Sequence, residues 1–270
     1  MPISSGADHE GPIATSGSDP ADATMLLAHA AGFCKELWHP VVAALRREQP
    51  DVEALLIDTR GHGQSTPHPG PFDPASIASD IIEIVDRIDR PVVGVGHSSG
   101  GAALPRVEAH RPGTFSKLVL IEPIIIEPPY ARRETPLSIS AAKRRVHFAS
   151  AERARRRFEK PFASWKPEVL DLYVEHAFEH TDDGLVLRCL PEVEAEVYRE
   201  GLNNDVWELI PHIRVPVTVV AGETSDTLTS SHLDRIVERF DDATLVVAEG
   251  HGHLVPMEAP DLIAEIIARA

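Results

Sequence analysis

A serine between glycines is the first candidate for chemistry in this sequence. The segment GHSSG, residues 96–100, follows the apolar run 91–93 and precedes a segment of helical spacing. A Gly-x-Ser-x-Gly pattern between a strand and a helix is typical of a sharp turn that presents the serine hydroxyl, here that of Ser98, as a nucleophile. Such a turn costs about 1–3 kcal/mol of backbone strain and needs small neighbours, which Gly96 and Gly100 supply. A Gly/Ser-rich loop without a function is the alternative, and the strand-to-helix context disfavours it.

A histidine is the second requirement, because a serine hydroxyl is a weak nucleophile at neutral pH. It needs an imidazole within hydrogen-bond reach and an acid that orients this imidazole. Of the 14 histidines in the chain, His251 and His253 lie in a glycine-rich loop after the last predicted strand. Both are therefore candidates for the base, and the alternative for each is a solvent-exposed turn residue.

The elements that must position these residues follow from hydrophobic patterning. Short apolar runs alternate with longer segments of helical spacing, which predicts a mostly parallel sheet with helices on both faces. Ile3 and Ile13 are candidates to begin two edge strands. The predicted strands are 25–28, 52–57, 92–96, 118–121, 217–221 and 243–247, and the predicted helices are 38–48, 74–89, 99–111, 230–239 and 260–269.

Residues 122–205 break this alternation, because they contain helical patterns and no clear strand. An insertion after a central strand must lie outside the sheet, and it would cover the crevice at the carboxyl ends of the strands. We therefore expect a core of residues 1–121 and 206–270 and an all-helical cap of residues 122–205. Within the cap the predicted helices are 139–158, 167–178 and 191–200.

Four separate stretches resemble motifs of the α/β-hydrolase fold superfamily, in the subgroup with a helical cap. GHSSG resembles its nucleophile elbow, and HAAGF, residues 29–33, resembles the loop after its third strand, with Ala30 in place of the usual glycine. DTRGHGQS, residues 58–65, is similar to the turn that braces the elbow, and GHGHLVPMEAP, residues 250–260, is similar to the histidine loop. The resemblance covers nearly the whole chain. It implies an α/β fold with a mostly parallel central sheet flanked by helices.

The resemblance also implies a catalytic triad in the order serine, acid, histidine. It places the nucleophile at Ser98 and the base at His253, with His251 at a variable position of the motif. The family often has its acid three or four residues beyond the glycine that ends the strand TVVAG, and Asp226 fits at four. Glu122, at the end of the strand before the insertion, is the rival, because some capped relatives take their acid from that position. The alternative roles are a helix N-cap for Asp226 and a hydrogen bond to cap backbone for Glu122.

Backbone N–H groups are the predicted donors to the oxyanion that forms during acyl transfer. The helix that begins near Ser99 points its free N–H groups at the reacting carbonyl, so we expect Ser99 N–H to be one donor. The resemblance implies Ala31 N–H as the second donor. Because a backbone amide serves here, alanine at position 30 leaves the activity intact.

Composition disfavours several other classes of protein. A formal net charge of −16 argues against nucleic acid binding, since phosphates must be met by a basic face. No apolar stretch is long enough to span a bilayer, and residues 1–20 lack the regions of a secretory signal, so we expect no membrane insertion and a cytoplasmic location. Cys34 and Cys189 are too few for a disulfide framework. We expect neither a cofactor nor a metal.

Residues 143–160 carry eight of the 26 basic residues of this acidic chain. Such a segment could steer an anionic substrate or contact a membrane surface. However, Val146, Ala149, Ala154 and Phe158 form an apolar stripe with the charges opposite. This amphipathic pattern favours a solvated helix face.

Together these observations predict a cofactor-independent serine hydrolase that cleaves an ester-like bond of a small molecule through an acyl-enzyme on Ser98, as a carboxylesterase or lipase does. Lactonase, amidase, thioesterase, perhydrolase and C–C hydrolase chemistry remain open, because one fold hosts many reactions. The second hypothesis is a small-molecule-binding relative with little turnover. The expected partner is a small-molecule substrate, and the sequence is also compatible with a homodimer.

Overall fold

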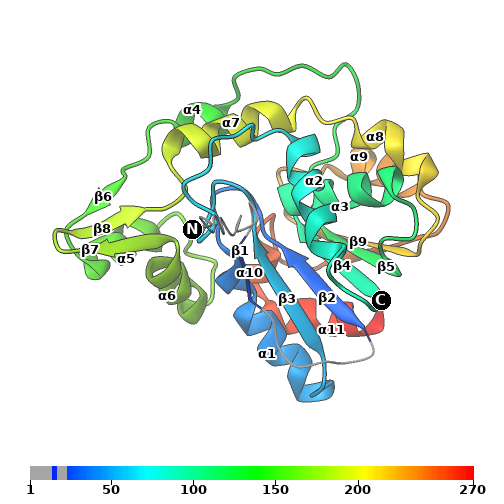
Figure 1. Cartoon of the computed structure of the whole chain (residues 1–270), viewed down its shortest axis with the longest axis horizontal. Coiled ribbons are helices and arrows are strands. Elements are labelled where there is room, and N and C mark those ends of the chain that lie inside the picture. The colour runs from blue at the N-terminus through cyan, green and yellow to red at the C-terminus, as the bar shows by residue number, and fades with distance from the viewer. Residues whose placement is uncertain (1–13, 17–22) are drawn as a thin grey trace, which may run out of the picture.

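A seven-stranded sheet with helices on both faces dominates the computed structural model, which describes residues 14–16 and 23–270 (Figure 1). The strand order is β1-β3-β2-β4-β5-β9-β10; β1 is antiparallel to β3, and all other neighbours are parallel. Ile3 and Ile13, where edge strands were expected to begin, lie outside the described residues. The strands are β1 (Ala14–Ser16), β2 (Thr24–Ala28), β3 (Glu53–Asp58), β4 (Val92–His97), β5 (Lys117–Ile121), β9 (Val217–Gly222) and β10 (Ala243–Ala248).

Parallel pairing brings the carboxyl ends of β4, β5 and β9 to one edge of the sheet. In the observed register, His97 of β4 lies beside Ile121 of β5, and Ile121 lies beside Val220 of β9. Ser98 and Glu122 are the residues that follow His97 and Ile121. The register therefore places them next to each other, where open α/β sheets bind their ligands.

Hydrophobic side chains alternate between the two faces of the central strands, so each face has its own core. In β2, Leu26 belongs to the core under α2, α3 and α9, whereas Leu27 belongs to the core under α1 and α11. The helices of this part of the chain are η1 (Lys35–Trp38), α1 (His39–Glu48), α2 (Pro74–Val85), α3 (Ser99–His110), α9 (Ser230–Val237), α10 (Val255–Glu258) and α11 (Pro260–Arg269).

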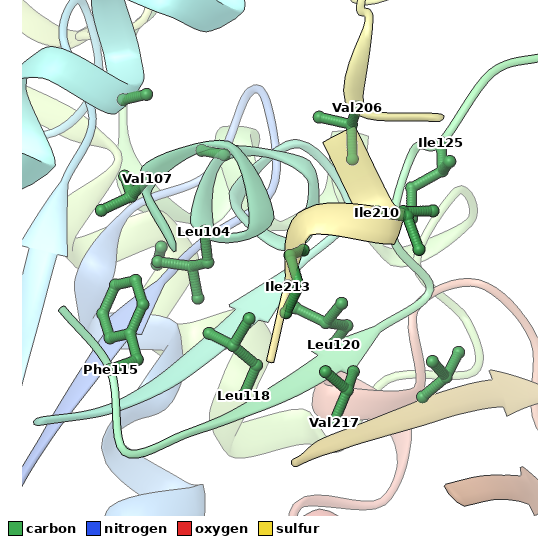
Figure 2. Close-up of a cluster of buried hydrophobic side chains, with 14 of the residues drawn as sticks. Leu104, Val107, Phe115, Leu118, Leu120, Ile125, Val206, Ile210, Ile213 and Val217 are labelled. Carbon is green, nitrogen blue, oxygen red and sulfur yellow. The ribbon is translucent and has the colours of Figure 1, made fainter. Parts of the chain in front are cut away.

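The segment just before β9 packs on the first of these cores. Figure 2 shows Val206 of α8 (Val206–Leu209) and Ile210 of η2 (Ile210–His212) close to Ile125. In the same cluster, Leu104 of α3 lies near Leu118 of β5 (Figure 2). Residues from 206 onward are thus joined to the sheet by apolar contacts.

Residues 122–205 do not form the all-helical segment that the sequence predicts. They contain a three-stranded antiparallel sheet of order β6-β8-β7, and the helix predicted over 139–158 is interrupted. These strands are only two to four residues long, too short for an alternating pattern to be recognised in the sequence. The elements are α4 (Pro136–Ala141), β6 (His147–Phe148), α5 (Ala151–Glu159), α6 (Pro167–His176), β7 (Phe178–Thr181), β8 (Gly184–Leu187) and α7 (Pro191–Gly201).

The fold class and the core elements are as predicted, with boundaries that differ by a few residues. The largest difference is in α2, which ends at Val85 instead of residue 89. Its start is fixed by Asp73, whose side chain accepts a hydrogen bond from Ser76 N–H at 2.9 Å. Within residues 14–16 and 23–270, no helix combines the length and apolar character needed to cross a membrane.

Candidate active site

Ser98 occupies a strained turn between β4 and α3. Its φ of 55° and ψ of −112° lie in a region that L-amino acids rarely adopt. The turn is tight: a Cβ at Gly96 would lie 2.6 Å from the carbonyl oxygen of Gly100, and a Cβ at Gly100 would lie 2.5 Å from that of Ala28. Ser98 N–H donates to the carbonyl of Ile121 at 2.9 Å, which ties the turn to β5.

Three side chains form a hydrogen-bonded chain that starts at this serine. His253 Nε2 lies 3.1 Å from Ser98 Oγ, and His253 Nδ1 lies 2.9 Å from Glu122 Oε2. A carboxylate accepts hydrogen bonds, so the imidazole proton belongs on Nδ1 and Nε2 is free to accept the serine proton. The three residues come from the end of β4, the end of β5 and the loop after β10.

Glu122 is completely buried and, like Ser98, has a positive φ, of 50°. Besides the bond to His253, its carboxylate accepts hydrogen bonds from Gly222 N–H and from Ser225 Oγ–H, each at 2.7 Å. These donors offset the loss of hydration that a buried carboxylate suffers. The end of β9 and the turn after it therefore hold this acid in one orientation.

Of the two candidate acids, Glu122 and not the favoured Asp226 makes the hydrogen bond to His253. Asp226 is exposed, and its Oδ1 lies 3.4 Å from Thr227 Oγ1. The physical reason is the course of the turn after β9: Ser225 points inward to Glu122, and the next side chain points to solvent. Spacing along the chain could not distinguish the two acids, since both follow neighbouring strands.

Residues 222–225, just before Asp226, hold the loop that carries His253. A Cβ at Gly222 would lie 2.6 Å from the carbonyl oxygen of His251, so β9 and this loop meet backbone to backbone. Thr224 donates to the same carbonyl from both its N–H and its hydroxyl, at 2.9 Å each. Neither contact was foreseen, because nothing in the spacing of these residues signals it.

His251, the other candidate for the base, is turned toward Glu258 of α10. Its Nδ1 lies 3.2 Å from Glu258 Oε2, which also accepts a hydrogen bond from Gly252 N–H at 3.1 Å. The second carboxylate oxygen of Glu258 accepts from Ser164 Oγ–H at 2.8 Å. Glu258 therefore links the histidine loop to the insertion between β5 and β9.

His97, the variable residue of the Gly-x-Ser-x-Gly motif, positions the backbone of His253. Its Nε2–H donates to the carbonyl of His253 at 2.8 Å, and the two rings are 5.3 Å apart. Burial, together with the nearby His253, lowers the pKa of His97 to about 3. Its imidazole is therefore neutral at physiological pH and acts as a fixed donor. Position 97 is variable in the motif, so the sequence gives no signal of this role.

Ala31 N–H and Ser99 N–H, the predicted oxyanion donors, make no hydrogen bond to another group among the described residues. Ser99 begins α3, where N–H groups lack a partner within the helix. Thr59 N–H donates to His29 Nε2 at 3.2 Å, so the proton lies on His29 Nδ1, which donates to the carbonyl of Ala30 at 2.7 Å. In a trans peptide, C=O and N–H point in opposite directions. This bond therefore also sets the direction of Ala31 N–H.

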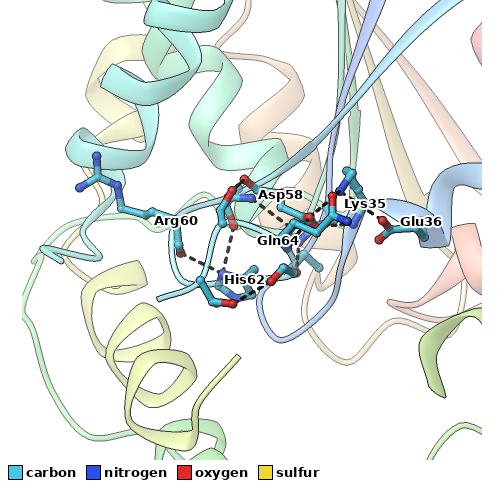
Figure 3. A network of polar contacts seen from close by, with 12 residues as sticks. Lys35, Glu36, Asp58, Arg60, His62 and Gln64 are labelled. Carbon is cyan, nitrogen blue, oxygen red and sulfur yellow. Dashed lines mark hydrogen bonds and ion pairs between the residues drawn. The ribbon is translucent and has the colours of Figure 1, made fainter. Parts of the chain in front are cut away.

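A buried polar network, shown in Figure 3, holds the remainder of the loop of residues 29–33. Gly32 N–H donates to His62 Nε2 at 2.9 Å, and burial lowers the pKa of His62 to about 3, so this nitrogen remains an acceptor. Asp58 accepts from Lys35 N–H at 2.8 Å and from Lys35 Nζ at 2.9 Å. The turn of residues 58–65 thus braces this loop directly.

The arrangement meets the geometric conditions for nucleophilic catalysis on a carbonyl. Ser98 is in contact with a base, the base is oriented by a carboxylate, and the N–H groups of Ala31 and Ser99 have no partner in the part of the chain that the structure describes. The sheet, the strained serine turn and the histidine loop together define an α/β hydrolase. A family model described as the alpha/beta hydrolase family matches residues 25–266, and the chain belongs to that family.

Individual relatives agree with this assignment. The abhydrolase domain-containing protein ACTT2-1 of Alternaria alternata is 32% identical in an alignment of 218 positions that covers 67% of this chain and 83% of that protein. Lipase LipV of Mycobacterium tuberculosis is 26% identical in an alignment of 251 positions that covers 91% of this chain and 92% of that protein. A solved thioesterase domain from the curacin biosynthetic pathway has a TM-score of 0.81 at 18% identity, with 96% of this chain and 95% of that chain covered. That likeness shows the fold alone.

Proposed function

We propose that the protein is a serine hydrolase that cleaves an ester-like bond of a small molecule through an acyl-enzyme on Ser98. The observation that carries this proposal is the hydrogen-bonded chain from Ser98 through His253 to Glu122. In this proposal Glu122 is the acid that keeps the proton of His253 on Nδ1 and stabilises the imidazolium that forms. Asp226 has no part in it.

The reaction takes place in two stages. Ser98 Oγ attacks the carbonyl carbon while its proton passes to His253 Nε2, and the oxyanion accepts hydrogen bonds from Ala31 N–H and Ser99 N–H. His253 then gives the proton to the departing alcohol, which leaves an acyl group on Ser98. In the second stage His253 takes a proton from water, the water attacks the acyl carbon, and Ser98 leaves with its proton restored.

The surroundings of the serine favour a substrate with an apolar part. Phe33, the last residue of the loop of residues 29–33 (here called the oxyanion loop), packs against Trp165 of the insertion with ring centroids 5.3 Å apart. Leu254, next to His253, packs against the same apolar cluster. We propose that residues 122–205 act as the cap of the site and supply this apolar surface. The name of the relative LipV, a lipase, supports the choice of a carboxylic ester.

The test is covalent labelling together with turnover. A fluorophosphonate probe should give one adduct, on Ser98, that is lost in Ser98→Ala and after heat denaturation. p-Nitrophenyl esters of graded acyl length should be hydrolysed by the wild type and not by Ser98→Ala. The absence of both adduct and hydrolysis in folded protein would refute the proposal and favour a binding protein without turnover.

A further inference from the structure

A buried ion pair of the insertion lies against the oxyanion loop. Glu194 of α7 pairs with Arg144, which lies between α4 and β6. The Glu194 side chain is 7% exposed and that of Arg144 is 18% exposed. Two tyrosine hydroxyls complete the cluster, because Tyr198 OH donates to Glu194 Oε1 at 3.3 Å and Arg144 donates to Tyr173 OH.

The point of contact with the oxyanion loop is Gly32. A Cβ at Gly32 would lie 2.5 Å from Glu194 Oε1, 2.8 Å from Glu194 Cδ and 3.2 Å from an Arg144 guanidinium nitrogen. The carboxylate is therefore seated directly on the backbone of this residue. Gly32 has a φ of 79°, so glycine is required there both for its conformation and for the space that Glu194 fills.

On its other side Gly32 is held by the core. Its N–H donates to His62 Nε2 at 2.9 Å, and the preceding residue is Ala31, whose N–H is the proposed oxyanion donor. Gly32 is thus fixed between His62 of the core and Glu194 of the insertion. A small shift of this residue would turn the neighbouring peptide and move Ala31 N–H away from the oxyanion.

Filling this space with charged side chains costs free energy of folding. Removing two charges from water costs several kcal/mol for each ion, and apolar side chains of similar volume often pack as well or better. The ring of Phe158 adjoins Arg144, 5.7 Å from its guanidinium carbon, so apolar neighbours are available at this position. Stability alone therefore does not account for the ion pair.

We propose that the Arg144–Glu194 pair is a positioning element of the oxyanion hole, through which the seating of the insertion sets the rate of turnover. Neither residue touches the substrate; both act through Gly32 and Ala31. This inference rests on the proposed function, because it assigns a role within the same reaction.

The first experiment compares Glu194→Gln with Glu196→Gln on the same helix. Glutamine at 194 keeps the shape of the side chain but removes its charge, and we expect kcat to fall about 10-fold, part of the 10²–10³ for loss of an oxyanion donor. KM should change less than 2-fold. Glu196 pairs with Arg132 and Arg199 near the surface, away from Gly32, so Glu196→Gln should retain wild-type kcat.

A second pair of variants separates positioning from stability. Arg144→Met/Glu194→Gln removes both charges, so its unfolding midpoint should recover toward the wild type while kcat stays low. Tyr198→Phe removes only the hydroxyl that donates to Glu194, and it should lower kcat by a smaller factor than Glu194→Gln. It replaces Glu194→Gln as the test if that variant does not fold. Equal kcat in all folded variants, with wild-type hydrolysis intact, would overturn this inference alone. Lack of hydrolysis and labelling in the wild type would overturn the proposed function instead.

Discussion

The core and the insertion reach Ser98 in two different ways. In the core, the backbone sets the geometry: Ser98 and Glu122 are the two non-glycine residues with positive φ among those that the structure describes. Glycines at positions 96, 100 and 222 let backbone segments touch around them. A methyl group added at one of these glycines would have no room. The structure could accommodate it only if the backbone of a neighbouring strand moved.

In the insertion, side chains set the geometry. Phe162 and Trp165 stack with centroids 4.0 Å apart, and Tyr173 meets Trp165 edge to face at 6.0 Å. The ion pair on Gly32 belongs to the same region. Contacts of this kind can repack when one member changes. The difference suggests that the core determines whether the reaction occurs, whereas the insertion adjusts its rate and its substrates.

The largest effect should come from the acid at the carboxyl edge of the core. Glu122→Gln keeps the shape of the side chain but removes the charge that orients His253, and we expect kcat to fall by about 10⁴. Asp226→Asn is the matched control, and it should leave kcat within 2-fold because Asp226 is exposed and makes no contact with His253. Steady-state hydrolysis of a p-nitrophenyl ester measures both. A large loss in Asp226→Asn with little loss in Glu122→Gln would show that the geometry of the acid differs in solution.

The second prediction contrasts a glycine of the core with one of the insertion. An alanine Cβ at position 100 would meet the carbonyl oxygens of Ala28 and His29 at 2.5 and 2.8 Å, so Gly100→Ala should lower the free energy of unfolding by about 3 kcal/mol. At Gly201, the last residue of α7, nothing lies within 4 Å of a Cβ. Gly201→Ala should therefore stabilise the protein by about 0.5–1 kcal/mol. Urea unfolding gives both values. Equal responses at the two sites would contradict the difference in backbone packing between the core and the insertion.

The core was predictable because its elements are long enough to show their period. Strands of five or six residues with buried apolar runs, such as β4 and β9, stand out from the amphipathic helices between them. The motifs also singled out Ser98 and His253, whose side chains lie 3.1 Å apart at the carboxyl ends of the strands. The choice between Glu122 and Asp226 was not predictable, because it depends on which side chain a turn directs inward, and that direction is set by Ser225 and Gly222.

The insertion was less predictable for a physical reason. Its strands show no clear alternation: β7, with sequence FEHT, has one buried and three exposed residues. These strands are recognised by their pairing, which the sequence does not show: β8 pairs with both β6 and β7. The contact of Glu194 with Gly32 likewise joins residues far apart in sequence. No local pattern signals such a contact.

The smallest effect is the contribution of a single buried histidine to the acid sensitivity of the core. Burial lowers the pKa of His97 and of His62 to about 3, and burial also lowers the pKa of His29. The folded protein keeps these imidazoles neutral. In the unfolded chain they have the ordinary histidine pKa of 6.5, so they become protonated below that pH. The free energy of unfolding should therefore fall as the pH drops below about 6.5, with a limiting slope of about 1.4 kcal/mol per pH unit for His97 and for His62, and His29 should contribute in the same direction. Above pH 6.5 these groups contribute no slope.

Replacing one of these histidines should reduce the change of unfolding free energy with pH by the contribution of one imidazole. His97→Gln retains a donor for the carbonyl of His253 and removes the titrating ring, so its unfolding free energy should depend less on pH between 7.5 and 5.5. His180→Gln, at an exposed position of β7, is the control from the insertion and should keep the wild-type slope. Urea titrations at several pH values measure these slopes. If His180→Gln flattened the dependence and His97→Gln did not, the acid sensitivity would belong to the insertion, and the rigid core with its neutral imidazoles would be the wrong description.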